Sequence, residues 1–196
     1  MSPTRVASYA VLGTIVVVGL AAPASADSEA VRDARHDVLS GEYFSDLPPT
    51  RHEPRRRLGD IVRTRVTLDT DLVVTTKYRS LDAGGAEQEY DWSIATSEAE
   101  FPWYAVLSVP QGTRDEHFFL ADPVANQPHC ATADLDRRHR KVTLTIPADC
   151  LGNPRWVRIA NGALYALEGQ RAYYDDARRD GGVRHGWRYG PKVKAG

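Results

Sequence analysis

The chain has few cysteines and methionines and no recognised catalytic or cofactor-binding motif. Among its 196 residues there are only two cysteines, Cys130 and Cys150, and a single methionine, Met1. No GxSxG, P-loop, GxGxxG, HxH or HExxH pattern occurs. The chain therefore lacks the sequence signatures of serine hydrolases, nucleotide-binding proteins and zinc proteases. We predict a non-enzymatic protein without a cofactor.

The sequence also lacks a strong charge bias. It has 25 Lys and Arg against 26 Asp and Glu, which gives a formal net charge of −1. Nucleic-acid binding usually requires a strongly basic surface, so we predict no nucleic-acid partner. Lysine is scarce relative to arginine, a usage typical of GC-rich bacterial genomes.

The longest apolar run lies near the N-terminus. Arg5 precedes an apolar stretch at 11–22, and Ala24-Ser25-Ala26 then offers a small-x-small cleavage site. The stretch has about 12 residues, fewer than the roughly 18–20 that span a bilayer. We predict that residues 1–26 are a signal peptide, that no transmembrane segment remains after cleavage, and that the protein is extracellular, either released or associated with the cell wall.

The two cysteines suit an exported chain. An even count in an oxidising compartment predicts a disulfide between Cys130 and Cys150. Closing the loop between them should contribute about 3 kcal/mol to stability. The alternatives are two free thiols or a metal site, although one pair without a CxxC motif lacks the ligands of a structural zinc site.

Apolar and polar residues alternate with a period of two from residue 61 onward. Val62, Val66 and Leu68 share a face in IVRTRVTLD, and Val142 and Ile146 share a face in KVTLTIP. We expect strands at 61–69, 72–79, 90–97, 101–109, 117–121, 130–136, 141–147, 155–160, 164–167 and 173–174. The pattern predicts an all-β fold: an antiparallel two-sheet β-sandwich of the jelly-roll or immunoglobulin-like kind. The alternative is an up-and-down β-barrel.

The chain divides into a lead-in and one domain. Residues 27–58 are polar and are interrupted by Pro48, Pro49 and Pro54. We expect this lead-in to be partly flexible, with a short helix or turn near 28–39. Residues 59–196 are expected to form a single β-sandwich domain with a Gly-rich C-terminal tail.

One predicted strand, RWVRIA at 155–160, carries a tryptophan between two arginines. If Val157 and Ile159 face the core, then Trp156 and Arg158 face outward, where a tryptophan ring can stack on a sugar. The alternative is that Trp156 packs under the C-terminal tail or against a neighbouring strand. The candidate ligand-binding residues are Trp103, Tyr104, Trp156 and Arg158.

Four segments together carry a family resemblance. GDIVRTRVTL, KVTLTIP, CLGNPRWVRI and YYDDARRDGG resemble segments of uncharacterised secreted actinobacterial β-sandwich proteins, which are distantly similar to DOMON-like and family-9 carbohydrate-binding-like sandwiches. The resemblance covers most of 55–185 and implies the fold and export, but no catalytic residues. DOMON domains bind haem or sugar; here the single methionine leaves with the signal peptide, so no methionine remains as an axial haem ligand.

Two charged segments are candidate sites. In YYDDARRDGG, the carboxylates of Asp175, Asp176 and Asp180 precede two glycines, which suits calcium, although Arg178 stands where an EF-hand would need a ligand. The alternative is a turn with surface ion pairs. A basic cluster could meet anionic wall polymers or lipid headgroups, or could be a solvated segment. Its members are Arg51, Arg55, Arg56, Arg57, Arg63 and Arg65.

These features predict a secreted non-enzymatic binding or interaction module of the cell envelope or extracellular space. Its partner would be a cell-wall polysaccharide or an envelope protein. A glycan ligand requires an aromatic strip on one outer face, drawn from Trp92, Trp103, Tyr104, Trp156 and Trp187. One alternative is a structural or stress-related protein without a small ligand. The other is a hydrolase with no recognisable motif, which needs paired carboxylates. These would come from Glu87, Glu89, Asp91, Glu98 and Glu100.

Overall fold

A computed structural model describes residues 27–42, 51–81, 86–124, 129–166, 171–178 and 188–196. Its elements are β1 (Ser28–Arg32), β2 (Leu39–Glu42), β3 (Arg51–His52), β4 (Ile61–Leu68), β5 (Asp71–Tyr78), β6 (Glu87–Thr96), β7 (Trp103–Val109), β8 (His117–Ala121), β9 (Thr132–Asp136), β10 (Lys141–Pro147), the 3-10 helix η1 (Ala148–Leu151), β11 (Trp156–Ala166), β12 (Arg171–Asp176) and β13 (Val193–Lys194). None of the described segments forms a helix long and apolar enough to cross a membrane.

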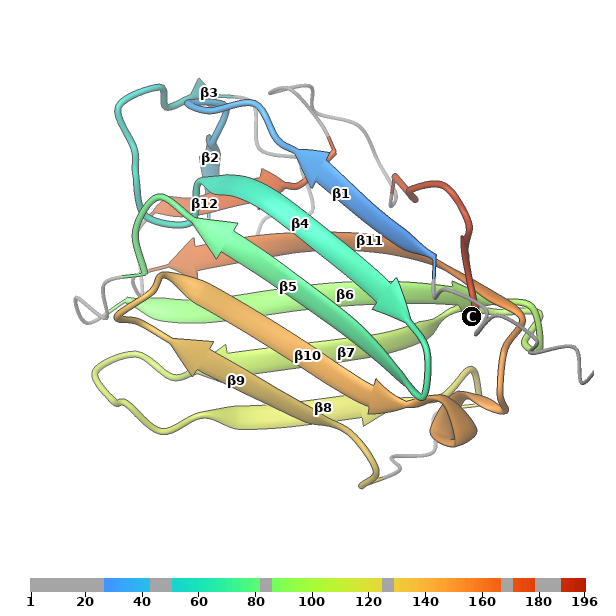
Figure 1. Cartoon of the computed structure of the whole chain (residues 1–196). Coiled ribbons are helices and arrows are strands. Elements are labelled where there is room, and N and C mark those ends of the chain that lie inside the picture. Colours follow the sequence, from blue (N-terminus) through green and yellow to red (C-terminus); the bar gives the residue numbers. More distant parts are fainter. Residues whose placement is uncertain (1–26, 43–50, 82–85, 125–128, 167–170, 179–187) are drawn as a thin grey trace, which may run out of the picture.

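Two antiparallel sheets lie face to face (Figure 1). The five-stranded sheet has the order β1-β4-β5-β10-β9. The eight-stranded sheet has the order β3-β2-β12-β11-β6-β7-β8, and β13 also pairs with β11. Neither sheet closes on itself or on the other, so the predicted two-sheet architecture is confirmed and the barrel alternative is wrong.

The lead-in contributes strands to both sheets. The expected helix or turn near 28–39 is wrong in its first part, because Ser28–Arg32 is the strand β1, which pairs with β4 from Ser28↔Thr67 to Arg32↔Arg63. A five-residue polar segment has little intrinsic preference, and the free edge of β4 determines its conformation. The short strands β2 and β3 extend the eight-stranded sheet beyond β12.

A β-bulge changes the alternation of inward and outward residues at the start of β4. The register between β4 and β5 shifts between Ile61 and Arg63. Such an insertion flips the residues on one side of it to the other face. Ile61 is therefore fully buried and Val62 lies partly exposed, so the prediction that Val62 shares the inner face with Val66 is wrong.

Between the sheets, large side chains fill the core. Trp92 is buried there, as are Tyr78, Tyr90 and Tyr165, whose rings pack edge to face. The hydroxyls of Tyr90 and Tyr165 lie 2.6 Å apart and share a hydrogen bond. Burying aromatic rings in this geometry stabilises the fold by roughly 0.5–1.5 kcal/mol per pair beyond the area they remove from water.

One buried amide joins the sheets. The side chain of Asn161, on β11, donates hydrogen bonds to the hydroxyl of Thr64 on β4 (3.2 Å) and to that of Thr76 on β5 (3.1 Å). All three side chains are buried. Asn161 lies within one continuous strand that includes the segments expected separately at 155–160 and 164–167.

The predicted disulfide is confirmed. Cys130 and Cys150 are bonded, with Cα atoms 6.2 Å apart. Cys130 precedes β9 and Cys150 lies in η1 directly after β10. The bond therefore closes the base of the β9–β10 hairpin.

Candidate functional site: a basic cleft

A cleft of about 530 Å³ opens at the end of the five-stranded sheet where β4 begins and β5 ends. Val62, turned outward by the bulge, and Tyr78 form part of its wall, and every other lining residue is cationic. The cationic residues are Arg35, Arg57, Arg63, Lys77, Arg79 and Arg140. Six positive side chains around one concave surface focus a positive potential that attracts anions.

Residues far apart in sequence meet in this cleft because of the sheet topology. Arg63 on β4 and Lys77 on β5 are register partners on the outer face. Arg35 comes from the link between β1 and β2, and Arg57 precedes β4. Arg140 ends the turn between β9 and β10, and β10 lies beside β5. The cleft therefore exists only when all of these strands are in place.

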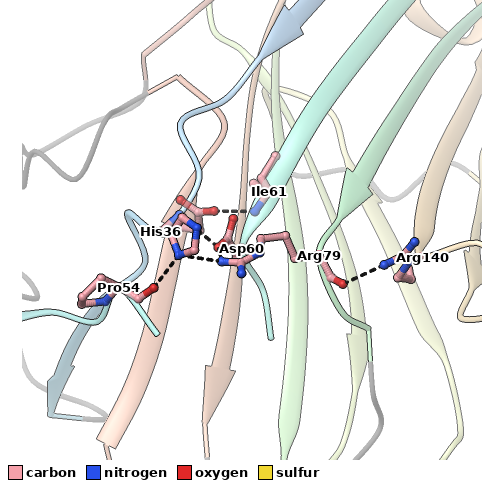
Figure 2. A network of polar contacts seen from close by, with 7 residues as sticks. His36, Pro54, Asp60, Ile61, Arg79 and Arg140 are labelled. Atoms are coloured by element: carbon pink, nitrogen blue, oxygen red, sulfur yellow. Dashed lines mark hydrogen bonds and ion pairs between the residues drawn. The ribbon is translucent and has the colours of Figure 1, made fainter. Parts of the chain in front are cut away.

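A buried carboxylate holds Arg79 in position (Figure 2). The side chain of Asp60 is fully buried, and its Oδ2 accepts hydrogen bonds from Arg79 Nη1 (2.6 Å) and from the backbone N–H of His36 (3.1 Å). His36 Nδ1 lies 2.6 Å from the carbonyl oxygen of Pro54 and 3.0 Å from Arg79 Nη1. Because a carbonyl only accepts, we assign the proton on Nδ1 to the shorter contact.

The backbone of Arg140 is unusual. Its φ of 58° lies in the left-handed region, which costs a residue with a Cβ atom roughly 1–2 kcal/mol relative to glycine. Its Nη1 donates a hydrogen bond to the carbonyl oxygen of Arg79 (3.2 Å), as Figure 2 shows. Among the described residues, only His36 and Asn153 are other non-glycine residues with positive φ. Two of the residues that contact Arg79, namely His36 and Arg140, thus have a strained left-handed backbone.

Among the described residues, most of the positive charge in the cleft has no carboxylate counter-charge nearby. In the described part of the chain, Arg79 is the single cationic lining residue with a carboxylate oxygen within 4.0 Å. Five cationic side chains face the same hollow without such a partner. Mutual repulsion between them destabilises the folded protein, and an anion in the cleft would relieve it.

A group of three carboxyl groups lies close to Asp60, the partner of Arg79. Asp33, Asp37 and Asp175 each place one oxygen within 4.8 Å of the others. Asp175 Oδ2 accepts a hydrogen bond from the backbone N–H of Ile61 (2.6 Å). Burial and neighbouring carboxylates, chiefly Asp175 and then Asp37, raise the pKa of Asp33 to about 10. Burial and Asp37 raise the pKa of Asp175 well above its usual range. Oxygen ligands of this kind suit a hard cation, and without one the group retains protons.

The structure does not group the residues of the predicted calcium site. Asp175 belongs to the group with Asp33 and Asp37, whereas Asp176 Oδ1 accepts a hydrogen bond from the backbone N–H of Arg178. Asp180 lies outside the described residues. The two carboxylates that join Asp175 come from the lead-in, and no local spacing in the sequence could have indicated them.

The raised pKa of Asp33 predicts a pH-dependent stability. Its carboxyl binds a proton up to about pH 10 in the folded protein, but only up to about its usual 3.8 in the unfolded chain. The stabilisation is therefore complete below pH 3.8 and is lost as the pH rises toward 10, with a slope of up to about 1.4 kcal/mol per pH unit. We expect Asp33→Asn to unfold at a higher urea concentration than the parent protein at pH 9, and to reduce the decline between pH 5 and 9.

The matched control is Asp134→Asn, which removes an exposed carboxylate from β9. This variant should keep the pH profile of the parent protein. If Asp33→Asn and Asp134→Asn gave the same profile, the protonated state assigned to Asp33 would be wrong.

The four residues predicted to bind a ligand do not form one surface. Trp156 lies on the outer face of β11, half-buried, with the Nζ of Lys192 4.1 Å from its ring centre. Arg158 Nε donates a hydrogen bond to the carbonyl of Gly190 (2.8 Å). Trp103 packs against the core, whereas Tyr104 is exposed on the opposite face of β7.

The predicted aromatic strip is also incomplete on the described surface. Trp92 is buried and Trp103 faces the core, so neither can stack on an external sugar. Tyr104 and Trp156 remain on the outer face of the eight-stranded sheet, and Trp187 lies outside the described residues.

Three of the candidate hydrolase carboxylates share a face of β6. Glu87, Glu89 and Asp91 alternate with the buried Gln88 and Tyr90 and therefore lie on the outward face. Tyr104 Oη donates a hydrogen bond to Asp91 Oδ1 (3.2 Å). Burial, and then Glu89, raise the pKa of Asp91 to about 7. Glu87 lies at the start of the strand, and Glu98 and Glu100 follow its end.

The predicted basic cluster is divided by the fold. Arg57 and Arg63 line the cleft, but Arg51 pairs with Glu53, and the guanidinium of Arg56 stacks 3.9 Å from the ring centre of Tyr173. The sequence did not indicate that Arg35, Lys77, Arg79 and Arg140 join the cleft. The outward position of Lys77 on its strand was the only available signal.

No family model, no curated protein and no solved structure matches this chain.

Proposed function

We propose that the protein is a secreted, non-enzymatic binding module that holds an anionic ligand in the basic cleft. The observation that carries this proposal is the set of five cationic lining residues without a carboxylate partner in the described part of the chain. Guanidinium groups bind phosphate and carboxylate oxygens through paired, charge-assisted hydrogen bonds. A site of this kind attracts an anion through its charge and holds it with fixed donors.

The positions of the arginines support a binding role over a purely structural one. Asp60 and His36 fix Arg79 at the cost of burying a charged pair, and Arg140 occupies a left-handed position where glycine would be unstrained. Both arrangements hold an arginine at the cleft in a fixed position, which a binding site for an anion requires. The signal-like sequence at 1–26 supports an extracellular location, where the ligand would be an anionic component of the cell envelope.

Removing one cation should weaken the binding of a small anion. We expect Arg57→Gln and Arg63→Gln each to raise the Kd for pyrophosphate about tenfold, which corresponds to the loss of one charge-assisted hydrogen bond of about 1.4 kcal/mol. Isothermal titration calorimetry at low ionic strength measures this change. Binding should also weaken as salt is added, because the contacts are ionic.

The control is Arg155→Gln, which removes a highly exposed arginine near the start of β11, at the other end of the sandwich. It should leave the Kd unchanged. Failure of the parent protein to bind pyrophosphate would contradict the proposal and favour the structural alternative. If the protein bound a neutral polysaccharide and Trp156→Ala abolished that binding, the binding site would instead lie on the eight-stranded sheet.

A further inference from the structure

A row of cations leads out of the cleft across the outer face of the five-stranded sheet. Arg32 on β1 is the register partner of Arg63 on β4, Arg63 is that of Lys77 on β5, and Lys77 is that of Lys141 on β10. All four side chains are exposed. We name these four residues the cation row. It shares Arg63 and Lys77 with the cleft.

Folding alone does not account for this row. Like charges directly opposite each other on paired strands destabilise a sheet, by several tenths of a kcal/mol per pair. The neighbouring row on the same face runs Ala30, Arg65, Thr75, Thr143 and Asp134, so the sheet does accept neutral and acidic residues at equivalent positions. In the described chain no carboxylate oxygen lies within 4.0 Å of any cation of the row.

We propose that the ligand of the basic cleft is a linear phosphate polymer, whose end occupies the cleft while the following phosphates lie along the cation row. This inference rests on the proposed function and names the ligand class of the same site. Neighbouring strands are about 4.8 Å apart, so the three intervals of the row extend about 14 Å across the sheet. A single small anion spans one interval, whereas a chain can contact the whole row.

The charges of the two parts match such a chain. The cleft gathers six cations around one hollow, which suits a terminal phosphate group, because such a group carries a charge of roughly −1.5 to −2. The row presents one cation per strand, which suits the single charges that repeat along a phosphate chain. The row ends at β9, where Asp136 pairs with His139 (2.6 Å) and supplies a negative group beside Lys141.

The same face gives no platform for nucleic-acid bases. Proteins that bind single strands combine a basic groove with exposed aromatic rings on which bases stack. Apart from Asp71 at the start of β5, the outward residues of β4, β5 and β10 are aliphatic, hydroxyl-bearing or cationic, and none is aromatic. The surface therefore recognises the repeating charge of the polymer, and we exclude bases from the proposed ligand.

The test compares chain lengths and two sets of variants by titration calorimetry. We expect long inorganic polyphosphate to bind the parent protein at least about tenfold more tightly, per chain end, than pyrophosphate does. The double variant Arg32→Gln/Lys141→Gln lies outside the cleft and should remove most of this advantage while leaving the Kd for pyrophosphate unchanged. Arg155→Gln should change neither value. Because both row residues are exposed, the double variant should remain folded, and its thermal midpoint should equal or exceed that of the parent protein.

The outcomes separate the two proposals. Equal Kd values for pyrophosphate and polyphosphate, or no effect of the double variant, would overturn the polymer and leave the cleft as a site for small anions. No binding of either probe would overturn both. A parallel titration with poly(glycerol phosphate) shows whether the protein prefers a phosphodiester polymer or a phosphoanhydride polymer. Tighter binding of single-stranded DNA, or of a polyuronate at equal charge, would refute the phosphate polymer as the preferred ligand.

Discussion

Replacing Asp60 with alanine is expected to lower the free energy of unfolding by about 3–5 kcal/mol, the largest effect of any substitution near the cleft. The carboxylate is fully buried and is the only acidic partner of Arg79 in the described chain, at 2.6 Å. Its removal leaves the guanidinium of Arg79, which is only 16% exposed, without a counter-charge, and leaves the backbone N–H of His36 without its acceptor. Urea denaturation at pH 7 measures the change.

Two further variants separate this effect from the general loss of an ion pair. Glu98→Gln breaks the contact with Arg155 at 3.9 Å, where the arginine is 83% exposed, and should change stability by less than about 0.5 kcal/mol. The double variant Asp60→Asn/Arg79→Met removes both charges and should recover much of the stability lost in Asp60→Ala, because no unpaired charge remains buried. If Arg79→Met made no difference in the Asp60→Asn background, the cost would not come from an unpaired charge.

Loss of the disulfide is expected to cost about 3 kcal/mol. Cys130 and Cys150 close a loop with a sequence separation of 20, and the reduced chain regains the conformational freedom of that loop when it unfolds. The double variant Cys130→Ala/Cys150→Ala should show this loss in urea denaturation, and reduction of the parent protein should give the same value. A double variant as stable as the oxidised parent would show that the bond does not restrict the unfolded chain.

The strands were predictable where one face is buried against the core. In β10, Val142, Leu144 and Ile146 alternate with polar residues, and all three are fully buried. The bulge at Val62 was not predictable, since it depends on how β4 pairs with β5 and leaves no local signal. β1 was missed for a related reason: its sequence SEAVR is polar, and only the free edge of β4 makes it a strand.

The candidate site was predicted only in part. The arginine-rich segment from Arg51 to Arg65 indicated Arg57 and Arg63, because a cluster of like charges within a few residues can be recognised in the sequence. Arg79 and Arg140 lie outside that segment, and the pairing of β4 with β5 and of β5 with β10 brings them to the same cleft. The cluster of three carboxyl groups is also assembled from distant segments. Asp175 was predicted as a calcium ligand, but its neighbours in space, Asp33 and Asp37, are more than a hundred residues away in sequence. Spacing rules work for sites within one segment, and these sites are assembled by topology.

The buried amide of Asn161 lies directly beneath the cation row. Its two partners, Thr64 and Thr76, are register partners of each other and are the immediate neighbours of Arg63 and Lys77. Repulsion between these two cations pushes β4 and β5 apart on the solvent side, and one amide group ties the same two strands together on the core side. The Asn161 side chain thereby links β4 to β5 through the two threonine hydroxyls. It lets the sheet carry a charge pattern that would otherwise loosen its pairing, and it confines the consequences of that repulsion to the outer surface.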